Sequence, residues 1–499
     1  MRIAILAWES LHSVAVGGVA VHTSELAKAL AGKGHQVHFF TRRMPGQSAH
    51  DCIDGVHYHR CSYLPHRDFV DDINNMCRSF VDRLFEVEDF VGKFDIVHVH
   101  DWLGANAMIW IKQGREHKTV LTIHSTEYAR SGNAFYNGQS VRIREQERAG
   151  IYWADRVIAV SEATKKEIMW MYEVPDRKVS VVGNGVDWGK FDIEVDPGKI
   201  KAEYGIGPLD PTVLFCGRLV WQKGPDILVE AIPSILRVYP NARFVFVGDG
   251  EMRGGLQARV QHLGVRHAVR FLGYRNGDGL VKLFKSSDAV CVPSRNEPFG
   301  IVVLEAWSAR KPVIVTENGG PNEYILHEVN GLKIYPRPDS VIWGINRVFS
   351  DFERARQMGH NGRLLLEERF SWDKITEQVL DVYRQVSPEP APQAQAVQQS
   401  IDVSPGNEVE LRQRRNGHAP VKVEARIMLP ESAENDAAYA VLEALNTKLA
   451  RQNFTLKQKD HYLKIRGDWE EVIKALYECR ERLHRNEDEF CVPITLCRE

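Results

Sequence analysis

The sequence lacks the features of a disulfide-stabilised, membrane-spanning or nucleic-acid-binding chain. Its eight Cys are scattered over 499 residues without a CxxC pair, which disfavours a disulfide framework and indicates a reducing compartment. No apolar run approaches the roughly 18 residues of a transmembrane helix, and Glu9 interrupts the N-terminal run too early for a signal peptide. Lys and Arg number 64 against 66 Asp and Glu, so no basic field attracts nucleic acid. We therefore expect a cytoplasmic protein without a transmembrane segment or a nucleic-acid partner.

Two nucleotide-binding fingerprints are also missing, namely G-x-G-x-x-G with its acidic partner and the P-loop G-K-[ST]. The first 41 residues nevertheless read as strand 2–7, a loop with Gly17 and Gly18, helix 19–31 and strand 36–41. A strand, glycine loop, helix and strand in this order predict a doubly wound α/β sheet with a ligand at the loop. The apolar share of 43% and the charged share of 26% are typical of globular domains.

Polar side chains follow two successive strands in the first half of the chain. His98, His100 and Asp101 gather at the end of the strand in 95–102, and His124 closes the next strand. Ligands bind at this edge of open α/β sheets. Three imidazoles and a carboxylate suit a transition metal, but His98 and His100 share one strand face and suit hydrogen-bonded structural roles as well. We predict no metal.

A second α/β pattern follows a crossing at 188–211, where Pro197, Pro208 and Pro211 are found. Arg218 and Lys223 follow its first strand, 212–216, and precede helix 226–238. A forked guanidinium and a compact ammonium together suit a diphosphate. The remaining predicted strands are 241–248, 269–273, 288–292 and 313–316.

The stretch 294–309 organises this second half. Pro298 suits the first turn of a helix, which would place Glu297 just before the helix and Glu305 about two turns into it. A helix N-terminus after a strand binds anions, and Gly300 lets a ligand approach the backbone. Two carboxylates accept hydrogen bonds from hydroxyl groups, so a nucleotide sugar fits both ends of this site.

The segment E-P-F-G-I-V-V-L-E at 297–305 resembles the E-x7-E motif of retaining glycosyltransferases of family four. The glycine loop with V-x-x-H-x-x-E-L-A, H-D-W at 100–102, N-G-V-D at 184–187 and G-R-L-x-x-x-K-G at 217–224 resemble the same family. The resemblance covers 1–386. It implies the GT-B architecture of two Rossmann-like doubly wound domains, and retaining, metal-independent transfer of a hexose from a nucleotide sugar.

The resemblance also implies roles for individual residues. His124 would lie near the anomeric carbon of the donor, Arg218 and Lys223 would neutralise the diphosphate, and Glu297 would contact the donor-sugar hydroxyls. The donor-binding residues would be Gly17, Gly18, Tyr274, Phe299, Gly300, Ile301 and Glu305. The acceptor candidates are His100, Asp101, Trp102, Tyr128 and Arg144, with Arg130 and Asn133 in the same polar segment.

The motifs H-V-H-D-W and W-Q-K-G resemble glucan synthases, which implies UDP-glucose or ADP-glucose, an α-glucan acceptor and a role in glycogen biosynthesis. Bacterial glycogen synthases carry K-x-G-G in the first loop, whereas this chain has Ala15, Val16, Gly17 and Gly18. A lipid or small-molecule acceptor is therefore the alternative, followed by a nucleotide-sugar epimerase and a non-catalytic sensor. The nucleotide sugar is a co-substrate, and we expect no further cofactor.

The sequence predicts four parts. Residues 1–190 form an acceptor-side domain, and 191–386 form a nucleotide-sugar-binding domain whose last helix, within 354–386, crosses back onto the first. Residues 387–418, with many Pro and Gln, predict a disordered linker. The order of strand, helix 435–452, two strands, helix 469–484 and strand in 419–499 predicts a ferredoxin-like α+β domain, for which homo-oligomerisation or a regulatory contact is a hypothesis.

Overall fold

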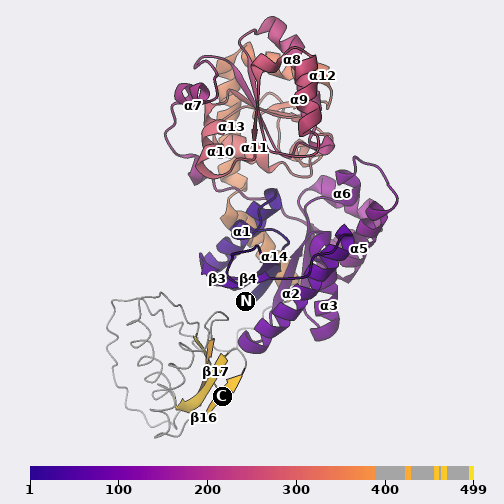
Figure 1. Ribbon diagram of the computed structural model, residues 1–499, viewed down its shortest axis with the longest axis vertical. Helices are drawn as coiled ribbons and strands as arrows, with labels where there is room; N and C mark the ends of the chain where they lie inside the picture. Colours follow the sequence, from indigo (N-terminus) through magenta and orange to yellow (C-terminus); the bar gives the residue numbers. More distant parts are fainter. Residues whose placement is uncertain (388–421, 429–454, 460–461, 469–493, 499) are drawn as a thin grey trace. The chain divides into compact units, whose positions relative to one another are not determined.

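The computed structural model describes residues 1–387, 422–428, 455–459, 462–468 and 494–498 (Figure 1). The chain divides into two compact units, the first made of Met1–Glu88 and Lys93–Ala391 and the second of Asp89–Gly92 and Pro392–Glu499. The first unit contains two sheets, of eight and six strands, each covered by helices. The predicted α/β class with two Rossmann-like sheets is therefore confirmed.

The first sheet has the strand order β3-β4-β2-β1-β5-β6-β7-β8. Its strands are parallel except for β3, which pairs antiparallel with β4 at the edge. The strands are β1 Arg2–Leu6, β2 Gln36–Arg42, β3 His50–Ile53, β4 Val56–Cys61, β5 Ile96–His100, β6 Thr119–Ile123, β7 Arg156–Ala159 and β8 Val179–Val181. The chain winds outward in one direction after β1 and in the other after β5, so the switch point, where such sheets bind ligands, lies between these two strands.

The helices of this sheet are α1 Gly18–Gly32, α2 Phe69–Val91, α3 Ala105–Arg115, α4 Glu127–Arg130, α5 Gln139–Trp153 and α6 Glu162–Tyr172. A further helix, α14 Trp372–Val386, comes from the end of the first unit and lies beside α1 (Figure 1). Val379 and Tyr383 of α14 share one buried cluster with Ile3 and Leu26. The core of the first sheet therefore includes a helix that follows the whole second sheet in sequence.

The second sheet is parallel throughout, with the order β11-β10-β9-β12-β13-β14. Its strands are β9 Thr212–Cys216, β10 Arg243–Val247, β11 Val269–Gly273, β12 Ala289–Val292, β13 Val313–Thr316 and β14 Leu332–Ile334. Its helices are α7 Pro197–Glu203, α8 Pro225–Val238, α9 Arg253–His262, α10 Gly277–Ser286, α11 Ile301–Ser308, α12 Pro338–Phe349 and α13 Phe352–Arg369. The switch point lies between β9 and β12, which precede Arg218 and Glu297.

One helix prediction in this half is wrong. Helix α11 begins at Ile301 rather than at Pro298, because Gly300 has a φ of 91°, which interrupts a right-handed helix. Glu305 is consequently the fifth residue of α11, about one turn in. The stretch predicted as helical, 354–386, holds α13 and α14, and the Ser371 side chain caps α14 by accepting from the Lys374 amide.

The described strands of the second unit form one antiparallel sheet. They are β15 Lys422–Met428, β16 Thr455–Lys459, β17 Tyr462–Asp468 and β18 Ile494–Arg498, in the order β16-β17-β15-β18. Placing the first strand between the third and the fourth is the order that a ferredoxin-like sheet requires. The predicted helices 435–452 and 469–484, and the predicted linker after Ser387, lie outside the described residues.

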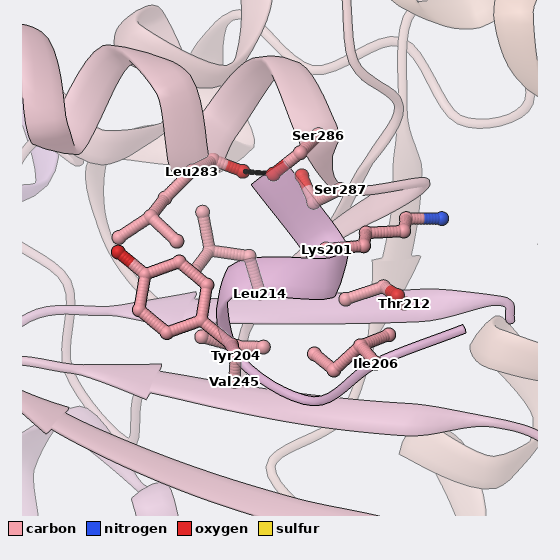
Figure 2. A pocket seen from close by; sticks show the side chains of 9 residues that line it. All are labelled: Lys201, Tyr204, Ile206, Thr212, Leu214, Val245, Leu283, Ser286 and Ser287. Carbon is pink, nitrogen blue, oxygen red and sulfur yellow. Dashed lines mark hydrogen bonds between the residues drawn. The ribbon is translucent and has the colours of Figure 1, made fainter. Parts of the chain in front are cut away.

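A small cavity lies inside the second sheet's domain, between α7, β9 and α10 (Figure 2). Its volume is about 10 Å³, which is about the room that one water molecule needs. The Lys201 ammonium at its rim donates to the Asp210 carbonyl at 2.9 Å and to Asp288 at 2.8 Å. This cavity is too small for a nucleotide. Among the described residues, no helix has the length and apolar character that a membrane span requires.

Candidate functional site

An ion pair joins the two switch-point loops of the second sheet. Lys223, at the end of a short 3₁₀ turn after β9, donates to the two carboxylate oxygens of Glu297 at 2.7 and 2.8 Å. Ser294 donates to the same carboxylate at 2.8 Å, and Glu297 is only 4% exposed. Charge-assisted bonds to a buried carboxylate hold both side chains in one geometry. The structure therefore brings together two of the residues predicted to contact the donor.

The backbone between Glu297 and α11 is packed tightly against two glycines. A Cβ on Gly319 would lie 2.1 Å from the Glu297 carbonyl oxygen, and one on Gly320 would lie 2.3 Å from that of Pro298. Gly319 and Gly320 thus permit close backbone contact here. The Phe299 side chain is 5% exposed, and a Cβ on Gly183 would lie 2.8 Å from its ring. Phe299 consequently has only its backbone available to a ligand.

Glu305 has a carboxylate without a hydrogen-bond or ion-pair partner in the part of the chain that the structure describes. Burial raises its pKa to about 7. Tyr274, which is half exposed, has a pKa raised by partial burial and then by the charges of Glu9, Cys216 and Glu305. Glu305 and Tyr274 therefore face one region at the ends of β9 and β11, and Glu305 retains its full capacity to accept hydrogen bonds.

Arg218 is exposed and lies two residues after the end of β9. Partial desolvation and the Arg130 guanidinium lower its pKa, whereas Glu297, Glu9 and Asp101 act in the opposite direction. Arg218, Glu297, Glu9 and Asp101 all belong to loops at the switch points of the two sheets, whereas Arg130 lies in α4. Arg218 is thus surrounded by charges from both halves of the first unit, where a bound anion would meet an unpaired guanidinium.

The glycine loop after β1 lies against the start of α11. A Cβ on Gly18 would lie 3.1 Å from Cδ1 of Ile301, which places two predicted donor-binding residues in contact. The amides of Val16 and Gly17 donate to one oxygen of Glu9 at 2.7 and 2.9 Å. Burial raises the pKa of Glu9, although these two hydrogen bonds oppose the shift.

Glu9 was not predicted as a site residue, although its position in the sequence indicates such a role. A carboxylate between a buried strand and a glycine loop is the nearest acceptor for the amides that such a loop leaves unpaired. Glu9 is only 3% exposed, a burial that a carboxylate shows when it is hydrogen-bonded. Its role is to fix the conformation of the loop.

His124 follows β6, and its amide donates to Asp101 at 2.7 Å. Its Nε2 lies 3.0 Å from Nδ1 of His100, and burial lowers its pKa to about 3. The imidazole is therefore neutral near pH 7. Asp101 has a φ of 57°, rare for a residue with a Cβ, and burial raises its pKa to about 6.

Three acceptor candidates lie behind His124 rather than at the surface. His100 is 1% exposed and Asp101 is 7% exposed, and both contact His124. Trp102 is 4% exposed and packs edge-on against Phe69 at 5.7 Å between ring centroids. Burial thus makes His100 and Asp101 supports for His124 and makes Trp102 a core residue.

His98 has the structural role that the sequence left open. Its Nδ1 lies 2.7 Å from the hydroxyl of Tyr383 on α14, and its Nε2 lies 2.7 Å from the hydroxyl of Thr122. Both ring nitrogens have partners, so His98 connects the first sheet to the returning helix.

Ion pairs, hydrogen bonds and aromatic contacts fix the conformation of the polar segment 125–150. Arg130 forms ion pairs with Glu127 and Glu147, and the Tyr172 hydroxyl donates to Glu147. The Tyr128 ring lies 5.0 Å from that of Phe135. Arg130 and Tyr128 therefore shape this segment.

Arg144 and Asn133 differ in what they contact. Arg144 donates to the Tyr136 carbonyl at 3.1 Å and lies 5.1 Å above the Phe135 ring. Asn133 accepts a hydrogen bond of 2.8 Å from Asn296, which precedes Glu297 in the second half. Asn133 consequently joins this segment to the loop that carries Glu297.

A polar cavity of about 210 Å³ lies where this segment meets the second half. Its hydroxyl, amide, carboxylate and guanidinium groups match the hydrogen-bonding needs of a polyhydroxylated ligand. The lining residues are Ser125, Thr126, Ala129, Asn133, Ala163, Thr164, Glu167, Arg295, Asn296, Pro298, Asn318 and Gly319. Asn133 belongs to this lining, whereas Tyr128, Arg130 and Arg144 do not.

Two family models match the sequence. The model described as Glycosyltransferase Family 4 matches residues 16–189, and the model described as Glycosyl transferases group 1 matches residues 197–365. The chain is 39% identical over 394 residues to an uncharacterized glycosyltransferase, MJ1607, of Methanocaldococcus jannaschii, covering 77% of this chain and 98% of that protein. It is 27% identical over 400 residues to a glycogen synthase of Mycobacterium tuberculosis, covering 77% and 94%. It is 29% identical over 387 residues to a D-inositol 3-phosphate glycosyltransferase of Jonesia denitrificans, covering 74% and 91%.

Solved structures share the fold at lower identity. Sucrose-phosphate synthase from Thermosynechococcus elongatus superimposes with a TM-score of 0.65 at 23% identity, and the catalytic domain of starch synthase IV from Arabidopsis thaliana does so with 0.62 at 17%. Each comparison covers 77% of this chain and 99% of the other. Together with the family models, they lead to one conclusion: the chain belongs to the family-four glycosyltransferases and has their GT-B architecture.

Proposed function

We propose that this glycosyltransferase moves glucose from UDP-glucose or ADP-glucose to an acceptor with retention of the anomeric configuration. The observation that carries the proposal is the Lys223–Glu297 pair, held at 2.7 and 2.8 Å beside the exposed Arg218 and the unpartnered Glu305. Two similar folds support a nucleotide-sugar donor, since Anabaena HepE was solved with UDP and glucose and starch synthase IV with ADP and acarbose.

In this proposal, the donor spans the end of the second sheet. Arg218 and Lys223 neutralise the diphosphate, and the backbone at Gly300 and Ile301 adds the positive end of α11. Glu297 accepts hydrogen bonds from the sugar hydroxyls. Glu305 accepts hydrogen bonds from the ribose, and the loop of Tyr274 packs on the base.

The glycine loop completes the donor site from the first half. Gly17 and Gly18 present backbone without side chains to the phosphates and to the acceptor, while Glu9 keeps the loop in shape. His124, a neutral imidazole, hydrogen-bonds the donor sugar near its anomeric carbon. Neutrality suits this place, because an uncharged ring both donates to and accepts from hydroxyl groups.

The transfer itself needs no protein nucleophile. The bond between the anomeric carbon and the diphosphate oxygen breaks, the acceptor oxygen bonds to the same face of that carbon, and the acceptor proton moves to the departing phosphate oxygen. The cations of Arg218 and Lys223 stabilise the negative charge that develops on the leaving group. These groups supply the positive charge for which other transferases use a metal ion, so the transfer is metal-independent.

An α-glucan is the acceptor that we propose first, with a place in glycogen biosynthesis. The similarity to a glycogen synthase supports it. The alternative is a lipid or small-molecule acceptor, which the similarity to a D-inositol 3-phosphate glycosyltransferase and the Ala15 of the glycine loop favour. In either case the acceptor enters from residues 1–190, and the donor binds to 191–386. Residues 387–418 would link these domains to an accessory domain at 419–499, and the scattered thiols fit a cytoplasmic enzyme.

A donor panel tests the proposal. The full-length protein is incubated with UDP-glucose, ADP-glucose and other nucleotide sugars, and nucleotide release is measured with glycogen, with a small polyol acceptor and without acceptor. Release that requires glycogen is the expected result, and release that requires the polyol supports the alternative. Absence of release with every donor would overturn the enzymatic function, and isomerised donor without acceptor would indicate an epimerase.

A further inference from the structure

Three histidines from three different elements converge at the switch point of the first sheet. His22 comes from α1, His100 from the end of β5 and His124 from the position after β6. One ring nitrogen of each lies within 4.8 Å of the others. We propose that this trio binds a transition-metal ion of the Zn²⁺ class, and that the bound ion inhibits the enzyme by occupying His124.

The distances are close to those of a three-imidazole metal site. Zinc binds imidazole nitrogen at about 2.0–2.1 Å, which sets neighbouring ligand nitrogens about 3.3 Å apart in a tetrahedron. Nδ1 of His100 and Nε2 of His124 already lie 3.0 Å apart. The His22 ring centroid lies 4.6 Å from that of His124 and 5.5 Å from that of His100. The His22 nitrogen lies within 4.8 Å of the other two ligand atoms, so it must move closer to complete the set.

Two ring nitrogens in this trio lack the partners that buried polar atoms normally have. Nδ1 of His22 and Nε2 of His100 are fully buried, and neither forms a hydrogen bond within the described residues. Buried donors and acceptors without partners are uncommon and call for a physical explanation. The unpartnered nitrogen of His22 is therefore open to a ligand, whereas that of His100 is the one opposite the nitrogen that lies against His124. Burial also lowers the pKa of all three imidazoles, so each ring is neutral and has one nitrogen without a proton.

The surroundings define which ion fits and how tightly. Three imidazoles suit Zn²⁺, Cu²⁺ or Ni²⁺, whereas Mg²⁺ requires oxygen ligands. His124 is partly exposed, which gives the ion a path of entry and leaves a fourth position for water. The Asp101 carboxylate bonds the His124 amide rather than a ring nitrogen. Missing outer-shell partners weaken metal sites by about 10–100-fold, so we expect micromolar rather than nanomolar affinity.

Inhibition follows from the proposed function, since His124 is there assigned to the donor sugar. An imidazole that ligates a metal ion directs its lone pair at the ion and no longer contacts a sugar hydroxyl. Ion and donor therefore exclude one another, and thermodynamic linkage requires each to weaken the other by the same factor. The metal site itself is independent of this assignment.

Cobalt spectroscopy and calorimetry test the site. Untagged full-length protein is titrated with Co²⁺, whose visible absorption reports nitrogen ligation, and then with Zn²⁺. One equivalent of Co²⁺ with a visible band, displaced by Zn²⁺ with micromolar affinity, is expected. His22→Asn and, separately, His100→Asn should each weaken binding at least tenfold, with thermal melting used to verify that the variants are folded.

The control is His57→Asn, because His57 lies on β4 in another group of stacked histidines. Unchanged binding is expected for this variant. Absence of a cobalt band, equal affinity in folded His22→Asn and wild type, or loss of binding in His57→Asn would each overturn the site. UDP-glucose and ADP-glucose, added separately to the zinc titration, then test exclusion alone, because only a donor that carries the sugar would occupy His124. An unchanged zinc affinity there would overturn the inhibition and leave the metal site standing.

Discussion

The two sheets of the first unit share one winding pattern, but the side chains at their switch points differ. At the second sheet, cations stand with a carboxylate, as in the 2.7 Å contact between Lys223 and Glu297. At the first sheet, the buried imidazoles of His22, His100 and His124 stand with carboxylates, and burial lowers the pKa of each imidazole. A fixed charge holds an anion by Coulomb attraction, whereas a neutral ring recognises hydroxyl groups without attracting phosphate. The contrast supports the proposed division, in which the second half anchors the diphosphate and the first half positions the sugar.

The largest expected effect comes from removing a charge at the second switch point. Lys223→Ala deletes a cation from the proposed diphosphate site and leaves Glu297, 4% exposed, without its ion-pair partner. Removing one group that stabilises developing charge lowers turnover by about 10²–10³-fold. Steady-state nucleotide release measures the loss. Lys28→Ala is the matched control, since Lys28 pairs with Asp54 on the surface. Rates within threefold of wild type for Lys223→Ala would contradict the anchoring role.

The next largest effect is expected at Glu147, a buried carboxylate in the first half. Its side chain is 1% exposed, forms an ion pair with Arg130, and accepts hydrogen bonds from the Tyr172 hydroxyl and the Glu127 amide. Glu147→Leu leaves these groups unpaired, and breaking a buried ion pair in this way destabilises a protein by about 3 kcal/mol. We expect a clear fall in melting temperature by calorimetry. Glu145→Leu, at an exposed position of the same helix, should melt like wild type, and equal melting of both variants would contradict the prediction.

Acid should weaken the first half before the second. Burial holds the pKa of His22, His38, His59, His98 and His100 well below 6.5. Below about pH 6.5 the unfolded chain binds protons that the folded chain excludes, so stability is retained above this pH and lost as the pH falls. Melting between about pH 8 and about pH 5, with proteolytic fragments mapped by mass spectrometry, checks this expectation. Earlier cleavage in 191–386, whose histidines are exposed, would reverse the comparison.

The smallest effect concerns Glu305 in the second half, whose carboxylate has no hydrogen-bond or ion-pair partner among the described residues. Burial raises its pKa to about 7, so it is mostly protonated below this pH and ionised above it. An ionised acceptor binds ribose hydroxyls more strongly than a neutral one. The donor KM should therefore fall about fivefold as the pH rises through 7. Glu305→Gln should remove this dependence, and a variant that retains the wild-type pH profile would exclude Glu305 as its source.

Apolar runs and motifs predicted much of the second half. The bounds of β9, β11 and β13 agree with the predicted strands, because parallel strands buried on both faces are continuous apolar runs. Lys223 and Glu297 were placed in loops after two strands, but the direct contact between their side chains was not predicted. Strand β4, V-H-Y-H-R-C, was not predicted, since histidine and arginine conceal a strand that is buried on both faces.

Other features depend on tertiary contacts that no local pattern encodes. The start of α11 depends on the positive φ of Gly300, and the role of Glu9 depends on a loop that folds back onto it. Trp102 was predicted as an acceptor contact, yet Phe69, from a helix that was not predicted, packs against it. His22, on α1, approaches His100 and His124 with ring centroids 5.5 and 4.6 Å apart, a tertiary contact that the spacing along the chain does not indicate.

Helix α14 has a consequence for how the chain folds during synthesis. The first sheet obtains part of its core from Val379, Leu380 and Tyr383, and Tyr383 also bonds to His98 across 285 positions of sequence. Domains that emerge first from the ribosome usually fold first. This sheet, however, emerges before α14, the helix that covers part of its apolar core. Until residue 386 is made, its apolar face stays open while the second sheet is translated and folds. Of the two halves of the first unit, the one whose synthesis begins first is therefore completed last.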